Sequence, residues 1–92
     1  MSNFNDRECN QITKLLIDFI LTNYPSQYHS DNLPLNQSLL ELGVLDSYAV
    51  IELVQFIESS WGITVEDYEI NKENLGSIIN MTNFVYKKIK KN

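Results

Sequence analysis

The serine at position 47 is the side chain of this sequence best placed to take part in chemistry. It follows Asp46 and stands between a segment that contains Gly43 and an apolar run, residues 49–57, that has the composition of a helix. This order predicts an exposed hydroxyl at the N-terminus of a helix, beside a carboxylate. A serine in that setting is either a plain helix cap or a site of chemistry.

Catalysis by the serine itself has little support in the sequence. A nucleophilic serine needs a base within hydrogen-bond reach and a third group that orients the base. The single histidine, His29, lies in a polar segment, and nothing in the sequence places it near Ser47. One Cys and one His cannot supply the usual metal ligands, and no glycine-rich phosphate loop is present. We therefore expect no catalytic residues, no metal site and no enzyme activity, and we expect Ser47 to be acted upon.

One helix is predicted on each side of a long polar segment. Apolar side chains recur at three- and four-residue steps from about Asn5 to Tyr24, and Pro25 ends that helix because the residue before proline avoids the helical region. A second helix is predicted over 47–60. Its cap is Asp46 or Ser47, and a glycine at position 62 closes it.

The remaining elements complete an all-helical prediction. A short element is expected over 65–70, and a last helix is expected to begin near residue 74 or 77. The segment 26–46 carries regularly spaced leucines, so we expect it to lie across the bundle, with one helical turn over 39–42. No strand pattern competes. The predicted class is all-α: a small bundle of three main helices plus a short helix, with a long loop between the first two helices.

Length and composition indicate one domain, residues 1–92. The hydrophobic fraction of 43% is typical of a globular protein and argues against disorder. No apolar run reaches the roughly 18 residues of a membrane span, and residues 1–6 lack the features of a signal peptide. The lone Cys9 excludes an internal disulfide and fits a reducing compartment. We expect a cytoplasmic monomer without membrane insertion.

Charge is distributed unevenly along the chain. The net charge is −5, and the stretch 15–71 contains nine acidic residues and no Lys or Arg. Such a surface repels phosphate backbones, so we expect no nucleic-acid partner. The acids could serve solubility alone. Because they flank Ser47, we favour attraction of proteins with basic docking patches. Lysines at 87, 88, 90 and 91 fit the negative end of the last helix.

The residues around Ser47 resemble those of the acyl carrier protein family. The resemblance rests on Glu41-Leu42-Gly43-Val44-Leu45-Asp46-Ser47-Tyr48, where an Asp-Ser pair precedes a hydrophobic residue, and on an acidic helix that opens at the serine. The chain length agrees as well. The turn Trp61-Gly62-Ile63-Thr64-Val65 is similar to the family's aromatic-Gly-Ile-x-Val/Ile turn. The resemblance extends over most of the chain.

This resemblance implies an acyl-carrier-like fold and a covalent cofactor. It implies that Ser47 carries a 4′-phosphopantetheine arm, transferred from coenzyme A by a phosphopantetheinyl transferase with Mg²⁺. Asp46 is the adjacent acid of the motif, and in related complexes such a residue helps to position the metal. The arm would hold acyl groups as thioesters and present them to a ketosynthase, dehydratase, reductase or acyl-ligase of fatty-acid, lipid or specialised-metabolite biosynthesis.

The helix that follows Ser47 is apolar well beyond one face, and such a helix is either buried or meets a partner. We expect Ile51, Val54 and Ile57 to join the core and to line a cavity for an acyl chain. The other side should face outward and form a docking surface for partner enzymes. The expected docking residues are Tyr48, Val50, Glu52, Gln55 and Glu58.

The chain departs from the common fatty-acid carriers, and two alternatives stay open. Ala49, Val50 and Gln55 stand where the family often has acidic or small polar residues, and Tyr48 replaces the usual leucine. The more apolar face suggests a dedicated pathway rather than general fatty-acid synthesis. The segment 44–47 with a weakly acidic helix also resembles aminoacyl or D-alanyl carriers, which have an adenylating partner. The other alternative is an unmodified helical module that binds proteins.

Overall fold

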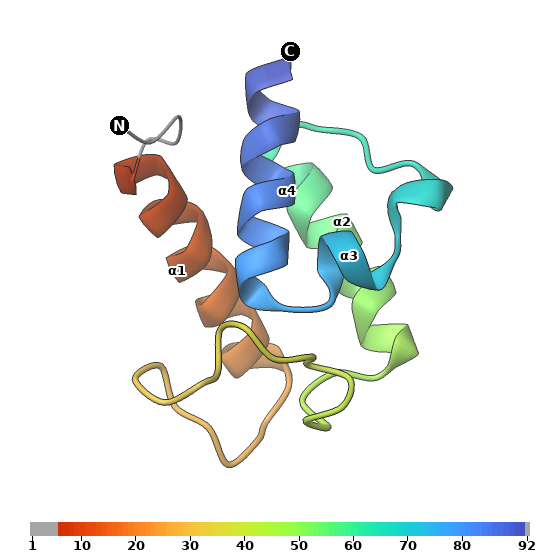
Figure 1. Cartoon of the computed structure of the whole chain (residues 1–92). Coiled ribbons are helices and arrows are strands. Elements are labelled where there is room, and N and C mark those ends of the chain that lie inside the picture. Colours follow the sequence, from red (N-terminus) through yellow and green to blue (C-terminus); the bar gives the residue numbers. More distant parts are fainter. Residues whose placement is uncertain (1–5, 92) are drawn as a thin grey trace.

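The computed structural model describes residues 6–91, and every regular element in this range is helical (Figure 1). The predicted all-α class is confirmed, with three long helices and short ones between the last two. No strand occurs in the described range. The elements are α1 (Asp6–Asn23), α2 (Ser47–Trp61), the 3₁₀ turn η1 (Asp67–Glu69), α3 (Lys72–Leu75) and α4 (Ile78–Lys91).

The helix ends follow the local signals of the sequence. α1 ends at Asn23, two residues before the proline, while its expected start at Asn5 lies outside the described residues. α2 closes at Gly62, which adopts the left-handed conformation with φ of +63° and donates its N–H to the Glu58 carbonyl. The stretch 39–42 forms a single turn, as expected, in which the Leu42 N–H donates to the Ser38 carbonyl at 3.0 Å, and it does not extend into a longer helix.

The core lies between the three long helices. α1 and α4 are antiparallel neighbours, and α4 also contacts α2 and α3 (Figure 1). A hydrogen bond of 2.7 Å between the Thr13 and Thr82 hydroxyls joins α1 to α4. Burying each large apolar side chain contributes about 1.5–3 kcal/mol. The largest fully buried side chains are Leu16, Ile20, Leu39, Leu53, Ile57, Ile78, Met81 and Val85.

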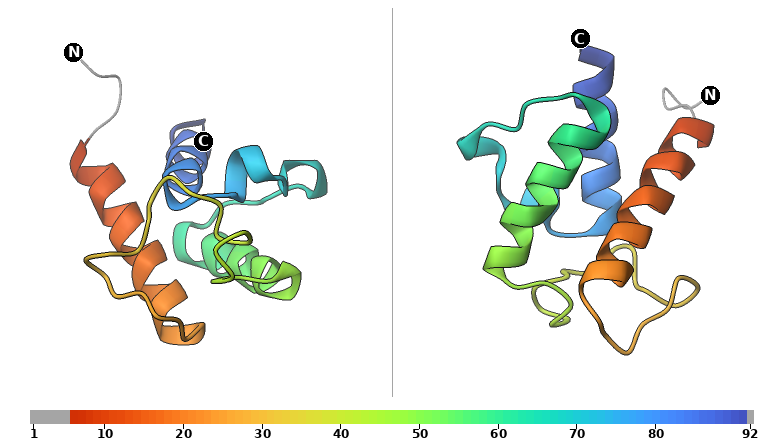
Figure 2. Two further views of the ribbon diagram at one scale, coloured as in Figure 1. Left: turned by 60° about the horizontal axis from the view of Figure 1, so that its bottom comes forward. Right: turned by 180° about the vertical axis from the view of Figure 1, so that it is seen from behind.

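The loop between α1 and α2 crosses one end of the bundle, as expected (Figure 2). Leu33 and Leu39 are buried, while Leu35 and Leu40 remain partly exposed. The backbone N–H of Leu39 donates to the carbonyl of Gly76 at 2.9 Å, so the loop is tied to the turn between α3 and α4. A Cβ at position 76 would lie 2.5 Å from the Lys72 carbonyl oxygen, which explains the glycine there.

One expectation for α2 is wrong. Ile51 was expected in the core, but its side chain is 46% exposed. The buried stripe consists of Ala49, Leu53 and Ile57 at four-residue steps, together with Val54. Ile51 lies about 200° around the helix from Ala49, because successive residues are about 100° apart. It therefore faces solvent beside α3 and not the core. None of the described helices combines the length and apolar character needed to cross a membrane.

The buried stripe of α2 predicts a clear difference between two leucine truncations. Leu53→Ala should lower the free energy of unfolding by about 2–5 kcal/mol, because it leaves a cavity at a fully buried position. Leu15→Ala, at a position 46% exposed on α1, should lower it by less than about 1 kcal/mol. Urea unfolding followed by circular dichroism measures both. Equal losses in the two variants would contradict the assigned core.

Candidate functional site

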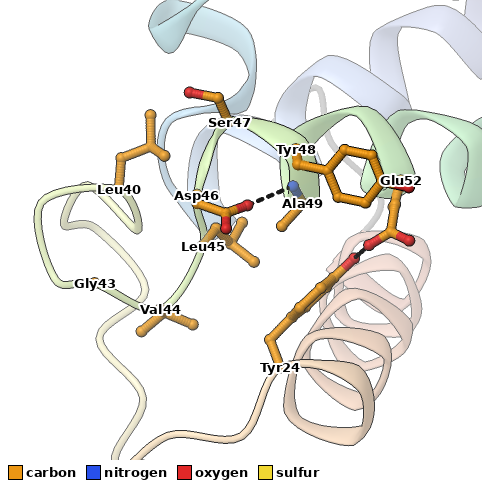
Figure 3. Close-up of a pocket in the computed structure, with 10 residues that line it drawn as sticks. All are labelled: Tyr24, Leu40, Gly43, Val44, Leu45, Asp46, Ser47, Tyr48, Ala49 and Glu52. Carbon is orange, nitrogen blue, oxygen red and sulfur yellow. Dashed lines mark hydrogen bonds between the residues drawn. The ribbon is translucent and has the colours of Figure 1, made fainter.

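Ser47 is the first residue of α2, and its side chain is exposed. The preceding residue, Asp46, has extended backbone angles and supplies the cap: its Oδ1 accepts the N–H of Ala49 at 2.8 Å. Of the two caps that the sequence allows, the structure therefore uses the aspartate. In Figure 3 the Ser47 hydroxyl points away from this bond. The serine is left out of the capping interaction, and its hydroxyl is accessible.

The chain before Ser47 is held by a tight turn and two buried side chains. Gly43 adopts φ of +76°, a conformation that other residues rarely take. The N–H groups of Val44 and Leu45 both donate to the Leu39 carbonyl, at 3.0 and 3.3 Å, and both side chains are buried. The N-terminus of α2 is thus fixed to the loop that crosses the bundle. The backbone that leads into Ser47 is therefore held by hydrogen bonds at this end of the molecule.

On the α1 side, Ser47 borders an acidic hollow (Figure 3). Tyr24 lies one residue beyond α1, and its hydroxyl donates to Oε1 of Glu52 at 2.5 Å. Burial, together with the hydrogen bond and the negative charge of Glu52, raises the pKa of Tyr24 from 10.0 to about 12. The hollow contains no basic side chain. Its lining is Tyr24, Leu40, Gly43, Val44, Leu45, Asp46, Ser47, Tyr48, Ala49 and Glu52.

On the α3 side, Ser47 borders a groove with a different character. The groove runs between α2 and the segment 70–76, and its walls are mostly apolar. Leu40 lines both the groove and the acidic hollow, so its partly exposed side chain separates them next to the serine. The apolar residues along the groove are Leu40, Val50, Ile51, Ile70 and Leu75.

The residues expected to dock partners do not share one surface. Tyr48, 73% exposed, and Gln55 lie on the α1 side of α2, as does Glu52. Val50 is half-buried and lines the groove on the other side. Glu58 lies toward the far end of the helix, where its Oε2 accepts the N–H of Val65 at 2.9 Å. The carboxylate of Glu58 thus holds the chain after α2, away from Ser47.

Three residues that make the hollow beside Ser47 acidic or the groove apolar were not predicted from the sequence. Tyr24 was assigned only to the apolar face of the first helix, and Leu40 only to the pinning of the loop. Ile51 was placed in the core. A tyrosine at the last position before Pro25 was a weak signal, since its hydroxyl needs a polar partner when half-buried. His29 is exposed in the loop and lines neither the acidic hollow nor the groove.

Comparison with known proteins adds no assignment. No protein-family model matches the chain, and no curated protein matches it.

The cap predicts how α2 responds to changes at position 46. Asp46→Ala removes the acceptor for the Ala49 N–H and should lower the free energy of unfolding by about 1 kcal/mol. Asp46→Asn keeps a side-chain oxygen at the same place and should change it by less than about 0.5 kcal/mol. Chemical unfolding of the two variants beside the wild type measures the difference. Equal destabilisation by both would show that the charge, and not the cap, is what matters.

The raised pKa of Tyr24 predicts a loss of stability in alkali. The folded protein keeps the Tyr24 proton after the unfolded chain has lost it, because the folded pKa is about 12 and the ordinary value is 10.0. The stabilisation is therefore complete below a pH of about 10 and is lost as the pH rises toward 12. Phenolate absorbance measured against pH should show a late step that Tyr24→Phe removes and Tyr68→Phe keeps. A late step that survives Tyr24→Phe would contradict the assignment.

Proposed function

We propose that this protein is a carrier whose Ser47 bears a 4′-phosphopantetheine arm, on which acyl intermediates are held as thioesters and presented to partner enzymes. The observation that carries the proposal is the accessible Ser47 hydroxyl at the N-terminus of α2, beside an aspartate that already caps the helix. A serine needed only for structure would make that cap itself. Here the cap is complete without it.

The N-terminus of α2 suits a phosphodiester on Ser47. The first N–H groups of a helix lack partners within the helix, and the dipole adds positive potential at this end. Both favour an anion attached there. The fixed turn before Ser47 would present the hydroxyl to a transferase in one orientation. When attached, the arm supplies a thiol that holds cargo, while the chain's own residues supply the anchor and the surface around it.

The surroundings of Ser47 favour a serine that is acted upon over one that attacks. The nearest titratable groups in its hollow are the acids Asp46 and Glu52 and the phenols Tyr24 and Tyr48. Tyr24, with a pKa of about 12, keeps its proton at neutral pH. The hollow has no imidazole that could take the proton of the serine. A phosphopantetheinyl transferase would supply the base and the Mg²⁺, with Asp46 as the adjacent carboxylate.

The groove on the α3 side supports an acyl cargo. Its apolar walls begin at Ser47, and an acyl chain lying along them would leave water. The partners would then be enzymes such as a ketosynthase, dehydratase, reductase or acyl-ligase, in the cytoplasm. The acidic hollow on the opposite side favours a second candidate, an aminoacyl or D-alanyl carrier, because its carboxylates would attract a cationic amine. The enzyme that charges the arm, an acyl-ligase or an amino-acid-adenylating enzyme, separates the two.

Intact-mass measurement tests the carrier proposal directly. After incubation with coenzyme A, Mg²⁺ and a broad-specificity phosphopantetheinyl transferase, the wild type should gain the mass of one phosphopantetheine group. Ser47→Ala should gain none, because the attachment oxygen is gone. Ser60→Ala, which removes an exposed serine from the other end of the same helix, should gain one group like the wild type.

Two results would contradict the carrier proposal. The first is a wild-type protein that stays unmodified while a known carrier in the same tube is fully modified. The second is equal modification of Ser47→Ala. An unmodified wild type would favour the remaining reading, a helical module that binds proteins through the exposed side chains around Ser47.

A further inference from the structure

A hydrogen bond beside Ser47 joins the residue that follows α1 to α2. This is the 2.5 Å hydrogen bond from the Tyr24 hydroxyl to Oε1 of Glu52 (Figure 3). α1 packs mainly on α4, and its ring contact with α2 is the stacked pair Phe19 and Phe56, whose centroids are 4.2 Å apart. The Tyr24–Glu52 bond therefore lies beside the ring contact that joins α1 to α2. Of the two carboxylates on α2, this bond engages that of Glu52.

The tyrosine ring is held independently of its hydroxyl. It meets the Phe19 ring edge-on, with centroids 6.0 Å apart, and Phe19 in turn stacks on Phe56. The Tyr24 N–H donates to the Ile20 carbonyl at 2.9 Å, which fixes the backbone just before Pro25. Removing the hydroxyl alone should therefore leave the ring in place. The hydroxyl is positioned by the rest of the structure, and Glu52 is positioned by the hydroxyl.

The partner of the Glu52 carboxylate in this contact is a phenol, which brings no positive charge to the carboxylate. The ion pairs Lys88–Glu69 and Lys90–Glu8 both lie toward the C-terminal end of α4, far from the loop end that carries Ser47 (Figure 1). No Lys or Arg occurs between residues 15 and 71. The Tyr24 hydroxyl thus holds Glu52 at the edge of the hollow that Ser47 borders, and within residues 6–91 no ion pair is formed with this carboxylate.

We propose that Tyr24 is a positioning residue, which holds the charged Glu52 carboxylate beside Ser47 for a lysine or arginine side chain of the enzymes that dock there. This inference rests on the carrier function proposed above. A free glutamate on a helix surface samples several rotamers and loses that freedom when a partner binds. Fixing it beforehand should improve binding about two- to tenfold.

Transferase kinetics on Tyr24→Phe test the proposal. The KM for the carrier in the phosphopantetheinyl transferase reaction should rise about two- to tenfold, with kcat changed little, because the variant alters docking and not the chemistry at Ser47. Tyr68→Phe, which removes the hydroxyl of a tyrosine that is 80% exposed on η1, should leave KM unchanged. Circular dichroism confirms that each variant is folded under the assay conditions.

A variant that removes the charge of Glu52 distinguishes a positioning role of Tyr24 from a merely structural one. Glu52→Gln keeps an oxygen that accepts the Tyr24 hydroxyl but removes the charge that a basic side chain would meet, so it should raise KM by itself. In that background, Tyr24→Phe should add no further increase, which is the signature of two residues that act as one unit. The KM increase of Tyr24→Phe should also shrink at high salt, where docking charges are screened.

Each result of these assays decides the proposal. An unchanged KM for Tyr24→Phe overturns it, and so does an increase that persists undiminished in the Glu52→Gln background. Either result leaves the carrier function intact, provided that wild type is modified and Ser47→Ala is not. If wild type itself gains no arm, the carrier function fails, and the positioning role of Tyr24 fails with it.

Discussion

The hydrogen bond from the Ala49 N–H to Asp46 Oδ1 is the interaction on which the character of this site depends. It sets the first turn of α2 and thereby decides that residue 47, and not residue 46, is the first to lie within the helix. A serine hydroxyl at the cap position would be occupied by the backbone, as serine caps are. One place further along, it faces away from the backbone and remains accessible. The identity of residue 46 therefore makes residue 47 available for chemistry.

The second constraint is that α2 has more apolar surface than the core can cover. Its buried residues are Ala49, Leu53, Val54 and Ile57, while the large side chains of Tyr48 and Ile51 stay exposed. Ile51 and Tyr48 are neighbours on the helix surface three positions apart: Ile51 lines the groove and Tyr48 lines the acidic hollow. The polarity of the hollow and that of the groove are then set by different neighbouring residues. The Tyr24–Glu52 pair makes one side acidic, and the apolar side chains of segment 70–75 make the other side a groove.

Features set by local geometry could be predicted from the sequence, and features set by distant contacts could not. The start of α2 after Asp46, its end at Gly62 and the end of α1 before Pro25 each depend on neighbouring residues alone. The Tyr24–Glu52 bond joins residues 28 positions apart, and no periodicity reports it. The exposure of Ile51 depends on the direction from which α4 and the loop approach α2, which the apolar pattern of a nearly all-round helix does not specify.

The separation of the two sides has a consequence for how a carrier would work. Tyr48 and Glu52 lie on the α1 side of α2, whereas Val50 and Ile51 line the groove on the α3 side. An enzyme whose basic side chain meets Glu52 would cover the acidic hollow and leave the groove open. Cargo lying in the groove and an enzyme docked on the acidic side would then not compete for the same residues, apart from Leu40 and Ser47, which both sides share. Transfer of cargo to the enzyme would thus require the arm to move from the groove to the acidic hollow, past Leu40. The docked enzyme would not have to dissociate.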